Sequence, residues 1–548
     1  MHHTTAKTRQ QKKSFWSPTN IALAIVFALW TLVRPLSRGT ISATIATSKE
    51  PQFMAVIDAG SSGSQIYIYK YFFSPYGHLI FQPDPATFKS TTSLDYFHER
   101  DIPQKAGASL EPLLEFAKAN VPHNLTKSTP IVLKVTSMGL RQVQYVQRNK
   151  EGVHSILQSV RTTLRNSNFQ FLPSYAEIIT GEEEATLGWL AINHLLETKN
   201  EGSFRHRSSS SAQNKPAWSV LNIGGSSVHV SIPLNDTIGV PGKYITSFSD
   251  KLLGYSLNLF THPFDGFGIV DAKTSVGMTV PYIKFTKRNG KFREDNKHEN
   301  EYDDDEYEYK DGDSDGDADE SGYYRKRKKA NLRQPDYRSA SYRDKQGHEI
   351  YYHPCYPSGY REANMHNWRG IGSFEECQYA IRHQDDTMKQ RSRKSFWKRI
   401  HGPDLNKPDH NKVWAFGIFY NIMSGVGEIA SDEAAREFSI SDFERIAKEI
   451  CEKPWKEIDA NYPKDTQPRE YNSDLCFSAI YAHSFLTFGL GFDPQQRITI
   501  GNKVENIDIH WTVGAVLQHL SKGNLLRSFP NHRTLAIDAL LTDGTFTV

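Results

Sequence analysis

The stretch Val56–Tyr69, VIDAGSSGSQIYIY, decides how the rest of the chain is interpreted. It reads as an apolar strand, a tight turn of glycine and serine, and a second strand in which isoleucine and tyrosine alternate. A turn of small residues leaves backbone N–H groups and hydroxyls open to an anion. Asp58, at the end of the first strand, adds a carboxylate that a divalent cation would link to that anion. Taken alone, the Gly/Ser turn is also explained by an ordinary hairpin.

A second copy of this plan changes the interpretation. Val220–Ile232, VLNIGGSSVHVSI, again has an apolar strand, a polar side chain near its end, a small-residue turn and an alternating strand. Two such hairpins in one chain suggest two similar lobes that grip one phosphate chain between them.

Composition and charge limit the class of protein that this chain can be. The chain has 548 residues, of which 38% are hydrophobic and 23% charged, as in ordinary globular proteins with two or more domains. The formal net charge is only +3, which gives no general attraction for nucleic acid. We therefore expect no nucleic-acid partner.

The N-terminus predicts membrane targeting. An apolar run, Ile21–Val33, follows a basic leader and precedes Arg34 and Arg38. We expect a cytosolic leader (1–20), an uncleaved signal anchor (21–36) and a stem (37–50), with the rest of the chain in a lumen or outside the cell. The run is short for a spanning helix, which favours a thin early-secretory membrane. The alternative is a signal peptide cleaved near the small residues of Ser42–Ala46, which would give a secreted protein.

The cysteines agree with a translocated chain. There are four, an even count with no CxxC spacing, which favours disulfides over a metal site: Cys355, Cys377, Cys451 and Cys476. The simplest pairing joins Cys355 to Cys377 and Cys451 to Cys476, although three pairings are formally possible. Two sequons, at Asn124 and Asn235, are candidate glycan sites.

Two further segments carry candidate chemistry. Ile131–Thr136 reads as a buried strand that leads to Arg141, an arrangement suited to phosphate oxygens, although a surface arginine after an ordinary strand fits as well. Tyr175–Thr180 reads as a strand that leads into a helix starting with Glu182, Glu183 and Glu184. Carboxylates favour a helix N-terminus in any case, and a general base needs only one of them.

Two other segments are expected to lack regular structure. Pro75–Ser93 reads as a loop-like connection after the first hairpin. Residues 286–345 are dominated by acidic and then basic residues, which cannot build a core. We expect this insertion to be disordered and dispensable for catalysis.

Five ordered motifs carry a resemblance to a known family: Asp58–Ser64, Gly139–Arg141, Gly181–Trp189, Asn222–His229 and Ile509–Gly514. Together they resemble the apyrases, the nucleoside triphosphate diphosphohydrolases, over nearly the whole chain outside the anchor and the insertion. The resemblance implies an α/β fold of duplicated ribonuclease-H-like lobes, as in actin and the sugar kinases, with a nucleotide cleft between them. Lobe I would comprise 51–172, completed by 500–548, and lobe II would comprise 173–499.

The resemblance also implies the reaction and its residues. Nucleoside di- and triphosphates would lose their terminal phosphate to give the monophosphate, with Ca²⁺ or Mg²⁺ as cofactor. Glu184 would be the general base, Ser227 would hold the attacking water, and the metal site would involve Asp58 and Asn222. The phosphates and base would be bound by Ser61, Ser62, Gly63, Ser64, Arg141, Gly224, Gly225, Ser226, His229, Tyr420 and Tyr481.

The chain departs from the family pattern at several positions. Asn222 replaces an Asp, which removes a negative charge near the metal. His229 replaces a Gln that helps to position water, Ala185 replaces a Gly after the base, and Ser137-Met138 replaces Thr-Ala in the second motif.

Two readings of function follow. The first is a nucleotide phosphatase in the lumen of the secretory pathway, anchored as a single-pass type II protein of the Golgi membrane. The alternative is a catalytically weakened nucleotide-binding or interaction protein that keeps the fold, and a sugar kinase is a weaker third option. The oligomeric state is left open.

Overall fold

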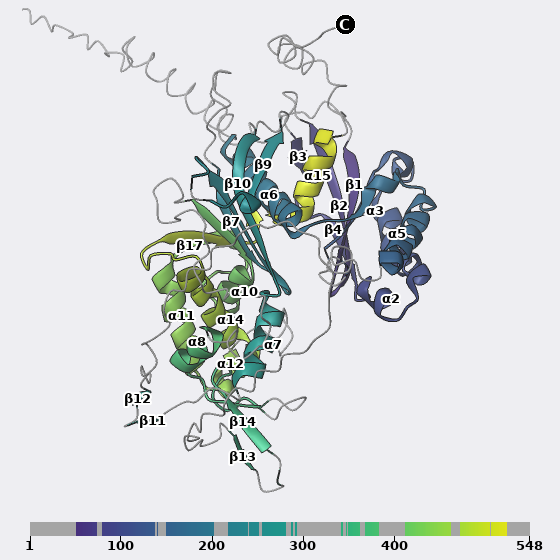
Figure 1. The fold of residues 1–548 in the computed structure, drawn as a ribbon. Coiled ribbons are helices and arrows are strands. Elements are labelled where there is room, and N and C mark those ends of the chain that lie inside the picture. The colour runs from purple at the N-terminus through teal and green to yellow at the C-terminus, as the bar shows by residue number, and fades with distance from the viewer. Residues whose placement is uncertain are drawn as a thin grey trace, which may run out of the picture.

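The computed structural model describes residues 51–73, 79–136, 140, 150–201, 217–238, 240–250, 255–280, 287–288, 291–292, 341–343, 347, 349–361, 368–382, 412–461, 472–504 and 506–522 (Figure 1). The predicted leader, anchor and stem lie outside these residues, as do Arg141 and most of the charged insertion. Within the described part, no helix is both long enough and apolar enough to cross a membrane.

The first sheet has the strand order β3-β2-β1-β5-β6, and β4 pairs with β2. The predicted first hairpin is the antiparallel β1–β2 pair, closed at Gly60 and Gly63, and β5 and β6 continue the sheet in parallel with β1. The strands are β1 (Gln52–Gly60), β2 (Gly63–Phe73), β3 (Leu79–Phe81), β4 (Ala86–Ser90), β5 (Ile131–Val135) and β6 (Ala176–Ile178).

The second sheet repeats this plan in the order β17-β18-β16-β7-β8-β10-β9. Its predicted hairpin is the antiparallel β7–β8 pair, and β16 and β18 continue in parallel with β7. The strands are β7 (Ser219–Ile223), β8 (Ser227–Leu234), β9 (Ile245–Asp250), β10 (Tyr255–Asp265), β16 (Val413–Gly417), β17 (Ala435–Ser439) and β18 (Arg497–Gly501). The shared topology is the duplicated two-lobed α/β arrangement expected from the motifs.

The helices form layers around and between the two sheets (Figure 1). Two helices far apart in sequence, α6 and α15, pack against each other in the middle and share a core with the facing surfaces of both sheets. The outer helices cover the far surface of each sheet. The bounds are α2 (Asp95–Glu99), α3 (Glu111–Asn120), α5 (Lys150–Arg165), α6 (Gly181–Glu201), α7 (Ile269–Thr279), α8 (Phe374–Arg382), α10 (Ile418–Gly425), α11 (Ile440–Glu452), α12 (Trp455–Asn461), α14 (Leu475–Ser484) and α15 (Trp511–Lys522).

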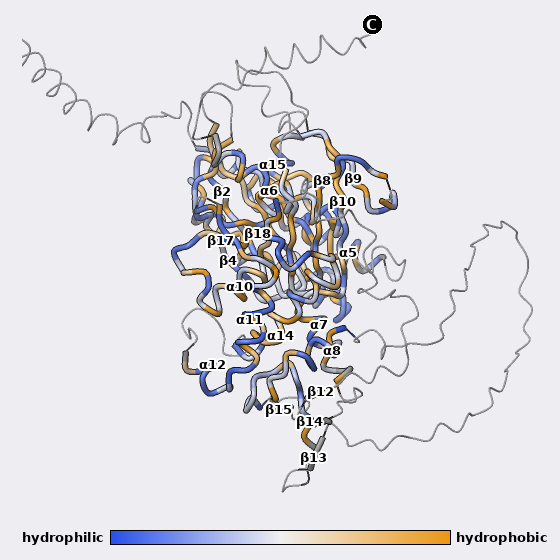
Figure 2. The backbone as a smooth tube through the Cα atoms, turned by 90° about the vertical axis from the view of Figure 1, so that its left-hand side faces the viewer, coloured by the Kyte–Doolittle hydropathy of each residue, from blue (hydrophilic) through white to orange (hydrophobic). Residues whose placement is uncertain are grey.

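The central strands are buried on both surfaces because their side chains alternate between two cores. In β1, Met54 and Val56 pack with α6 and α15, whereas Ala55 and Ile57 pack with the outer helices α3 and α5. Figure 2 shows hydrophobic and hydrophilic positions alternating along the backbone tube. The near-continuous apolar run of β1 is therefore what a central strand of this fold requires.

Short strands change two of the sequence-based expectations. Within the stretch expected to be a loop, 75–93, the chain forms β3 and β4, both paired with β2. At the edges of the predicted insertion it forms β11 (Lys287–Arg288), β12 (Lys291–Phe292) and β13 (Ser341–Arg343). At these edges the chain is in short strands, whereas disorder stays a prediction for the rest of the insertion, which lies outside the described residues. The remaining short strands are β14 (Glu349–His353), β15 (Trp368–Gly370), β19 (Lys503–Val504) and β20 (Ile507–Asp508).

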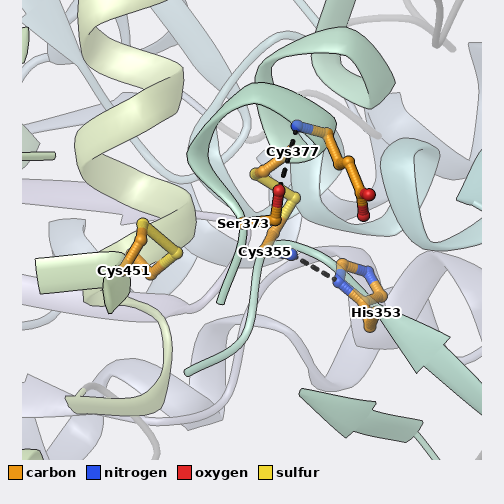
Figure 3. Close-up of a disulfide and its surroundings, with 7 residues drawn as sticks. His353, Cys355, Ser373, Cys377 and Cys451 are labelled. Atoms are coloured by element: carbon orange, nitrogen blue, oxygen red, sulfur yellow. Dashed lines mark hydrogen bonds between the residues drawn. A yellow bond between two sulfur atoms is a disulfide. The ribbon is translucent and has the colours of Figure 1, made fainter. Parts of the chain in front are cut away.

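Both predicted disulfides are confirmed. Cys355 is bonded to Cys377 and Cys451 to Cys476, each with a Cα–Cα distance of 4.8 Å. Figure 3 shows the Cys355–Cys377 bridge, with the backbone N–H of Cys355 donating to the His353 ring. Both bridges lie in the core on the outer side of the second sheet, and the second one links α11 to α14.

Removing the second bridge is expected to destabilise the protein. A Cys451→Ala/Cys476→Ala double variant should lose about 2–5 kcal/mol of unfolding free energy, because the unfolded chain regains the freedom of a closed loop. Urea unfolding of the oxidised protein and the variant measures this difference. A loss well below 1 kcal/mol would mean that the packing of α11 on α14 alone fixes this region.

Candidate functional site

The site is built around Asp58, near the C-terminal end of β1. Its Oδ1 accepts a hydrogen bond from Thr136 Oγ1 over 2.7 Å, and its Oδ2 accepts one from Trp511 Nε1 over 3.3 Å. Thr136 directly follows β5 and Trp511 begins α15, so neighbouring elements of the first lobe hold the carboxylate from two sides. Its side chain is 19% exposed.

The surroundings of Asp58 disfavour its negative charge. Burial, and then the nearby carboxylate of Glu184, raise the pKa of Asp58 to about 7. His510 Nε2 lies 3.7 Å from Asp58 Oδ2, but burial lowers the pKa of His510 far below its ordinary value. His510 is therefore neutral at pH 7 and supplies no positive charge to Asp58.

These features fit a hard divalent cation. A buried carboxylate with a raised pKa, and the amide oxygen of Asn222, are oxygen donors of the kind that Ca²⁺ and Mg²⁺ prefer. Asn222 is partly exposed near the end of β7, where Gly417 leaves room for its Oδ1. In the described part of the chain, no cluster of three or more His, Cys, Asp or Glu could hold a metal. A cation held by Asp58 and Asn222 would take water and substrate oxygens as further ligands.

The three glutamates at the start of α6 have different surroundings. Glu183 forms a capping box with Thr180: its Oε2 accepts from the Thr180 N–H over 2.8 Å, and its own N–H donates to Thr180 Oγ1 over 3.0 Å. Glu182 is close enough to His262 to act on the pKa of that ring. Glu184 is only 14% exposed and its Oε2 lies 3.9 Å from His229 Nε2. Of the three, Glu184 is the one that faces both His229 and Asp58.

Strand β8 brings two candidate residues to the same place. Ser227 and His229 are two residues apart, so both side chains lie on one face of the strand. Ser227 Oγ is 3.1 Å from His229 Nε2, the same nitrogen that Glu184 approaches. The Glu184 carboxylate and the Ser227 hydroxyl thus converge on one ring nitrogen of His229, each within 4 Å of it.

The first phosphate-type turn, between β1 and β2, has exposed Ser61 and Ser62 and a buried Gly63. Gly63 has φ +128° and lies directly against the Ser90 carbonyl, where a side chain would collide, so only glycine fits there. Ser64 is also buried, and its Oγ has no hydrogen-bond partner among the described residues. The exposed hydroxyls are therefore those of Ser61 and Ser62.

Lys89 is a candidate that the sequence analysis missed. It lies on β4 opposite Gln65 of β2, and its Nζ donates to Ser62 Oγ over 3.4 Å. Its positive charge also lowers the pKa of Asp58 slightly. A lysine beside a small-residue turn could attract a phosphate. The only local sign of a strand here was a short alternation of residues around Lys89, within a stretch expected to be a loop.

The remaining predicted residues lie at the second turn, after β5 and on the helices α10 and α14. The second turn presents an exposed Gly225 between partly exposed Gly224 and Ser226. Arg141 lies outside the described residues; its neighbour Leu140 is held by a hydrogen bond from its N–H to Asp95 Oδ1 over 3.0 Å. Tyr420, on α10, is partly buried against the second-lobe core.

Tyr481 is not positioned as a stacking partner for a base. The side chain is fully buried in α14, its ring stacks on Phe477, and its hydroxyl donates to the Phe267 carbonyl over 2.6 Å. A base could reach this ring only if the core opened. The motif match placed an aromatic residue correctly in sequence but carried no information about its burial.

Comparison with known proteins agrees with the geometry. The model of the GDA1/CD39 (nucleoside phosphatase) family matches residues 44–532. Ectonucleoside triphosphate diphosphohydrolase 1 of Rattus norvegicus is 25% identical over 514 residues, covering 88% of this chain and 82% of the relative. Nucleoside-diphosphatase uda-1 of Caenorhabditis elegans is 22% identical over 480 residues, covering 84% and 80%.

A solved structure supports the fold. The crystal structure of nucleoside triphosphate hydrolases from Neospora caninum matches with a TM-score of 0.54 at 13% identity, covering 93% of this chain and 98% of that one. At this identity the likeness concerns the fold alone. The match of the family model over most of the chain, with both phosphate-type hairpins inside it, identifies this chain as a member of the GDA1/CD39 nucleoside phosphatase family.

Proposed function

We propose that the protein removes the terminal phosphate from nucleoside di- and triphosphates, using water activated by Glu184 and a divalent cation held near Asp58. Membership of the family already implies an apyrase-like hydrolase of nucleotide phosphoanhydrides. The observation that carries the finer proposal is the convergence of Glu184, Ser227 and His229 beside Asp58, between the two turns.

Each group has a role that its position supports. Glu184 accepts the proton of the attacking water, and Ser227 and His229 hold that water by hydrogen bonds. The backbone N–H groups of the two turns, with Lys89, bind the phosphate oxygens and offset the charge that spreads over them as the bond breaks. A bound Ca²⁺ or Mg²⁺ would supply Lewis-acid stabilisation of the phosphoryl oxygens.

The cellular setting is part of the same proposal. The predicted anchor at 21–36, together with two disulfides, supports a lumenal catalytic part on a single-pass type II protein of the Golgi or secretory membrane. A released product of lumenal glycosylation, a nucleoside diphosphate, is then the natural substrate. We also keep the division into lobe I (51–172 with 500–548) and lobe II (173–499) as a proposal.

The test is phosphate release by the full-length protein from nucleoside di- and triphosphates, with Ca²⁺ or Mg²⁺ and then with excess chelator. We expect cation-dependent release that chelation reduces to background and re-addition of cation restores. Hydrolysis that continues unchanged in excess chelator would contradict the cation requirement. Nucleotide binding without any phosphate release would favour the weakened, non-catalytic alternative, which the Asn222 and His229 departures motivate.

A further inference from the structure

We propose that the segment Gly266–Val270, which leads into and begins α7, holds the second phosphate-type turn in its working shape. We call this segment the α7 brace. Gly268 and Ile269 are then positioning residues for the proposed reaction, because they act through the turn Gly224–Ser226 and not on the substrate. The inference rests on the proposed function, since it assumes that this turn binds phosphate.

Backbone hydrogen bonds join the brace to the turn. The N–H groups of Ile269, Val270 and Gly266 donate, in that order, to the three consecutive carbonyls of Gly224–Ser226, over 2.9, 2.9 and 2.8 Å. The first N–H groups of a helix have no acceptor within the helix, so the turn also satisfies the start of α7. All three carbonyls of the turn are therefore directed at the brace.

This arrangement fixes the direction of the turn's N–H groups. In a planar trans peptide the C=O and the following N–H point in opposite directions. Because the carbonyls of Gly224 and Gly225 point to α7, the N–H groups of Gly225 and Ser226 point away from it. Successive N–H groups with a common direction form a site for an anion, which makes the brace the element that orients the proposed phosphate contacts.

Gly268 is required by the closeness of this contact. Its backbone angles, φ −64° and ψ 165°, are open to any residue, so conformation does not demand glycine here. A Cβ on Gly268 would instead overlap the carbonyl of Gly225 and the nitrogen of Ser226. An alanine at this position therefore has to push the turn and the brace apart.

The brace is anchored to the second lobe, so the turn has to yield when the two are forced apart. Lys273 of α7 forms an ion pair with Asp474 over 2.7 Å, and Ala272 and Val276 are buried in the second-lobe core. The buried hydroxyl of Tyr481 donates to the carbonyl of Phe267, one residue before Gly268. This contact ties the brace to the second-lobe core, in which Tyr481 is buried.

The first experiment compares two alanine substitutions at glycines near and within α7. Gly268→Ala should lower kcat/KM about 10²-fold, the size of effect that a displacement of about 1 Å produces at a catalytic site. Gly277→Ala is the matched control, because no described residue outside its own stretch of helix lies within 4 Å of the added Cβ, and it should leave kcat/KM unchanged. The affinity for β,γ-imido-ATP, measured by calorimetry where circular dichroism shows both variants folded, should fall at least about tenfold for Gly268→Ala alone.

The second experiment removes one hydrogen bond of the brace and displaces the Gly224 carbonyl, because the Cδ of a proline takes the place of the N–H that holds it. Ile269 is the first residue of α7, where proline is well accommodated, and Gly268 before it is already extended, as a residue before proline prefers. Ile269→Pro is therefore compatible with the start of the helix, but it deletes the N–H that holds the Gly224 carbonyl and places the ring Cδ against that carbonyl. Ile269→Ala keeps that N–H but removes more of the side chain, which is partly buried against the core.

The two substitutions at Ile269 separate positioning from packing. Where circular dichroism shows both variants folded, we expect Ile269→Pro to bind β,γ-imido-ATP about tenfold more weakly than Ile269→Ala. Equal affinities of the two Ile269 variants for β,γ-imido-ATP, or a normal affinity of Gly268→Ala for it, would overturn the proposed role of the brace. If the wild-type protein binds the analogue but releases no phosphate, the proposed reaction is refuted and the brace is still tested by affinity. If it neither binds the analogue nor releases phosphate, the proposed reaction and the brace are both refuted.

Discussion

Glu184→Gln is expected to lower the turnover number about 10²–10⁴-fold, the contribution of a positioned general base. The amide keeps the shape of the side chain but cannot accept the proton of the attacking water. The proposed phosphate contacts come from the two turns and Lys89, so the affinity for β,γ-imido-ATP should change much less than turnover. Steady-state phosphate release together with calorimetry of the analogue measures the two quantities separately.

The neighbouring glutamates are the matched controls. Glu183→Gln should retain near-normal turnover, because glutamine also completes a capping box with Thr180. Glu182→Gln should be mild as well, since this carboxylate acts on the pKa of His262. If Glu184→Gln kept normal turnover while one of these two lost it, the base would have been assigned to the wrong carboxylate.

The second large effect is a coupling between cation binding and pH. The pKa of Asp58 is raised to about 7, so below pH 7 the carboxyl is mostly protonated and a cation has to displace a proton. The cation concentration for half-maximal activity should therefore rise about tenfold for each unit that the pH falls below 7, and become constant above it. Ca²⁺ and Mg²⁺ titrations of phosphate release between pH 5.5 and 8.5 measure this slope.

The same pKa gives a stability effect with a defined sign. A carboxyl whose pKa is raised in the folded state favours folding when it is neutral, so this contribution is complete below about pH 4 and is lost as the pH rises through about 7. A cation added above pH 7 should restore the lost stability, which thermal unfolding with and without Ca²⁺ detects. A cation affinity that stayed flat from pH 5.5 to 7 would mean that Asp58 titrates as an ordinary exposed Asp, or that it is not at the metal.

Glu184 offers a control on the cause of this shift. The charge of Glu184 contributes to the raised pKa of Asp58, after burial. In Glu184→Gln this repulsion is gone, so the pKa of Asp58 should fall. The pH below which Ca²⁺ affinity begins to decrease should therefore be lower than in the wild-type protein. Calorimetry suits this comparison because the variant is expected to have little activity.

The parts of the fold that were predicted correctly are those set by local sequence. Each phosphate-type hairpin joins strands that neighbour each other in the chain, so alternation and turn residues were enough to locate them. The disulfides were predictable for a similar reason, because each links cysteines only 22 or 25 residues apart. The repeated hairpin then pointed to the repeated sheet.

The errors arose where distant contacts decide the outcome. Strand β4 is short and its middle residues are exposed, so no apolar pattern marks it, and it forms because β2 offers a free edge. Missing β4 also meant missing Lys89. Tyr481 shows the same limit, because it is buried in the second-lobe core and its hydroxyl bonds to Phe267, more than 200 residues earlier in the chain.

The hydrogen bond between Asp58 and Trp511 has a consequence for the order in which the protein is made. The two residues are 453 positions apart, and Tyr69 is likewise bonded to Thr512. A growing chain therefore carries an unfinished first lobe, with the Asp58 carboxylate unsupported on one side, until α15 has been made. Contacts of such long range form slowly, because most of the chain has to be ordered before they close. The proposed cation site is thus expected to form only after the whole stretch from β1 to α15 has been made.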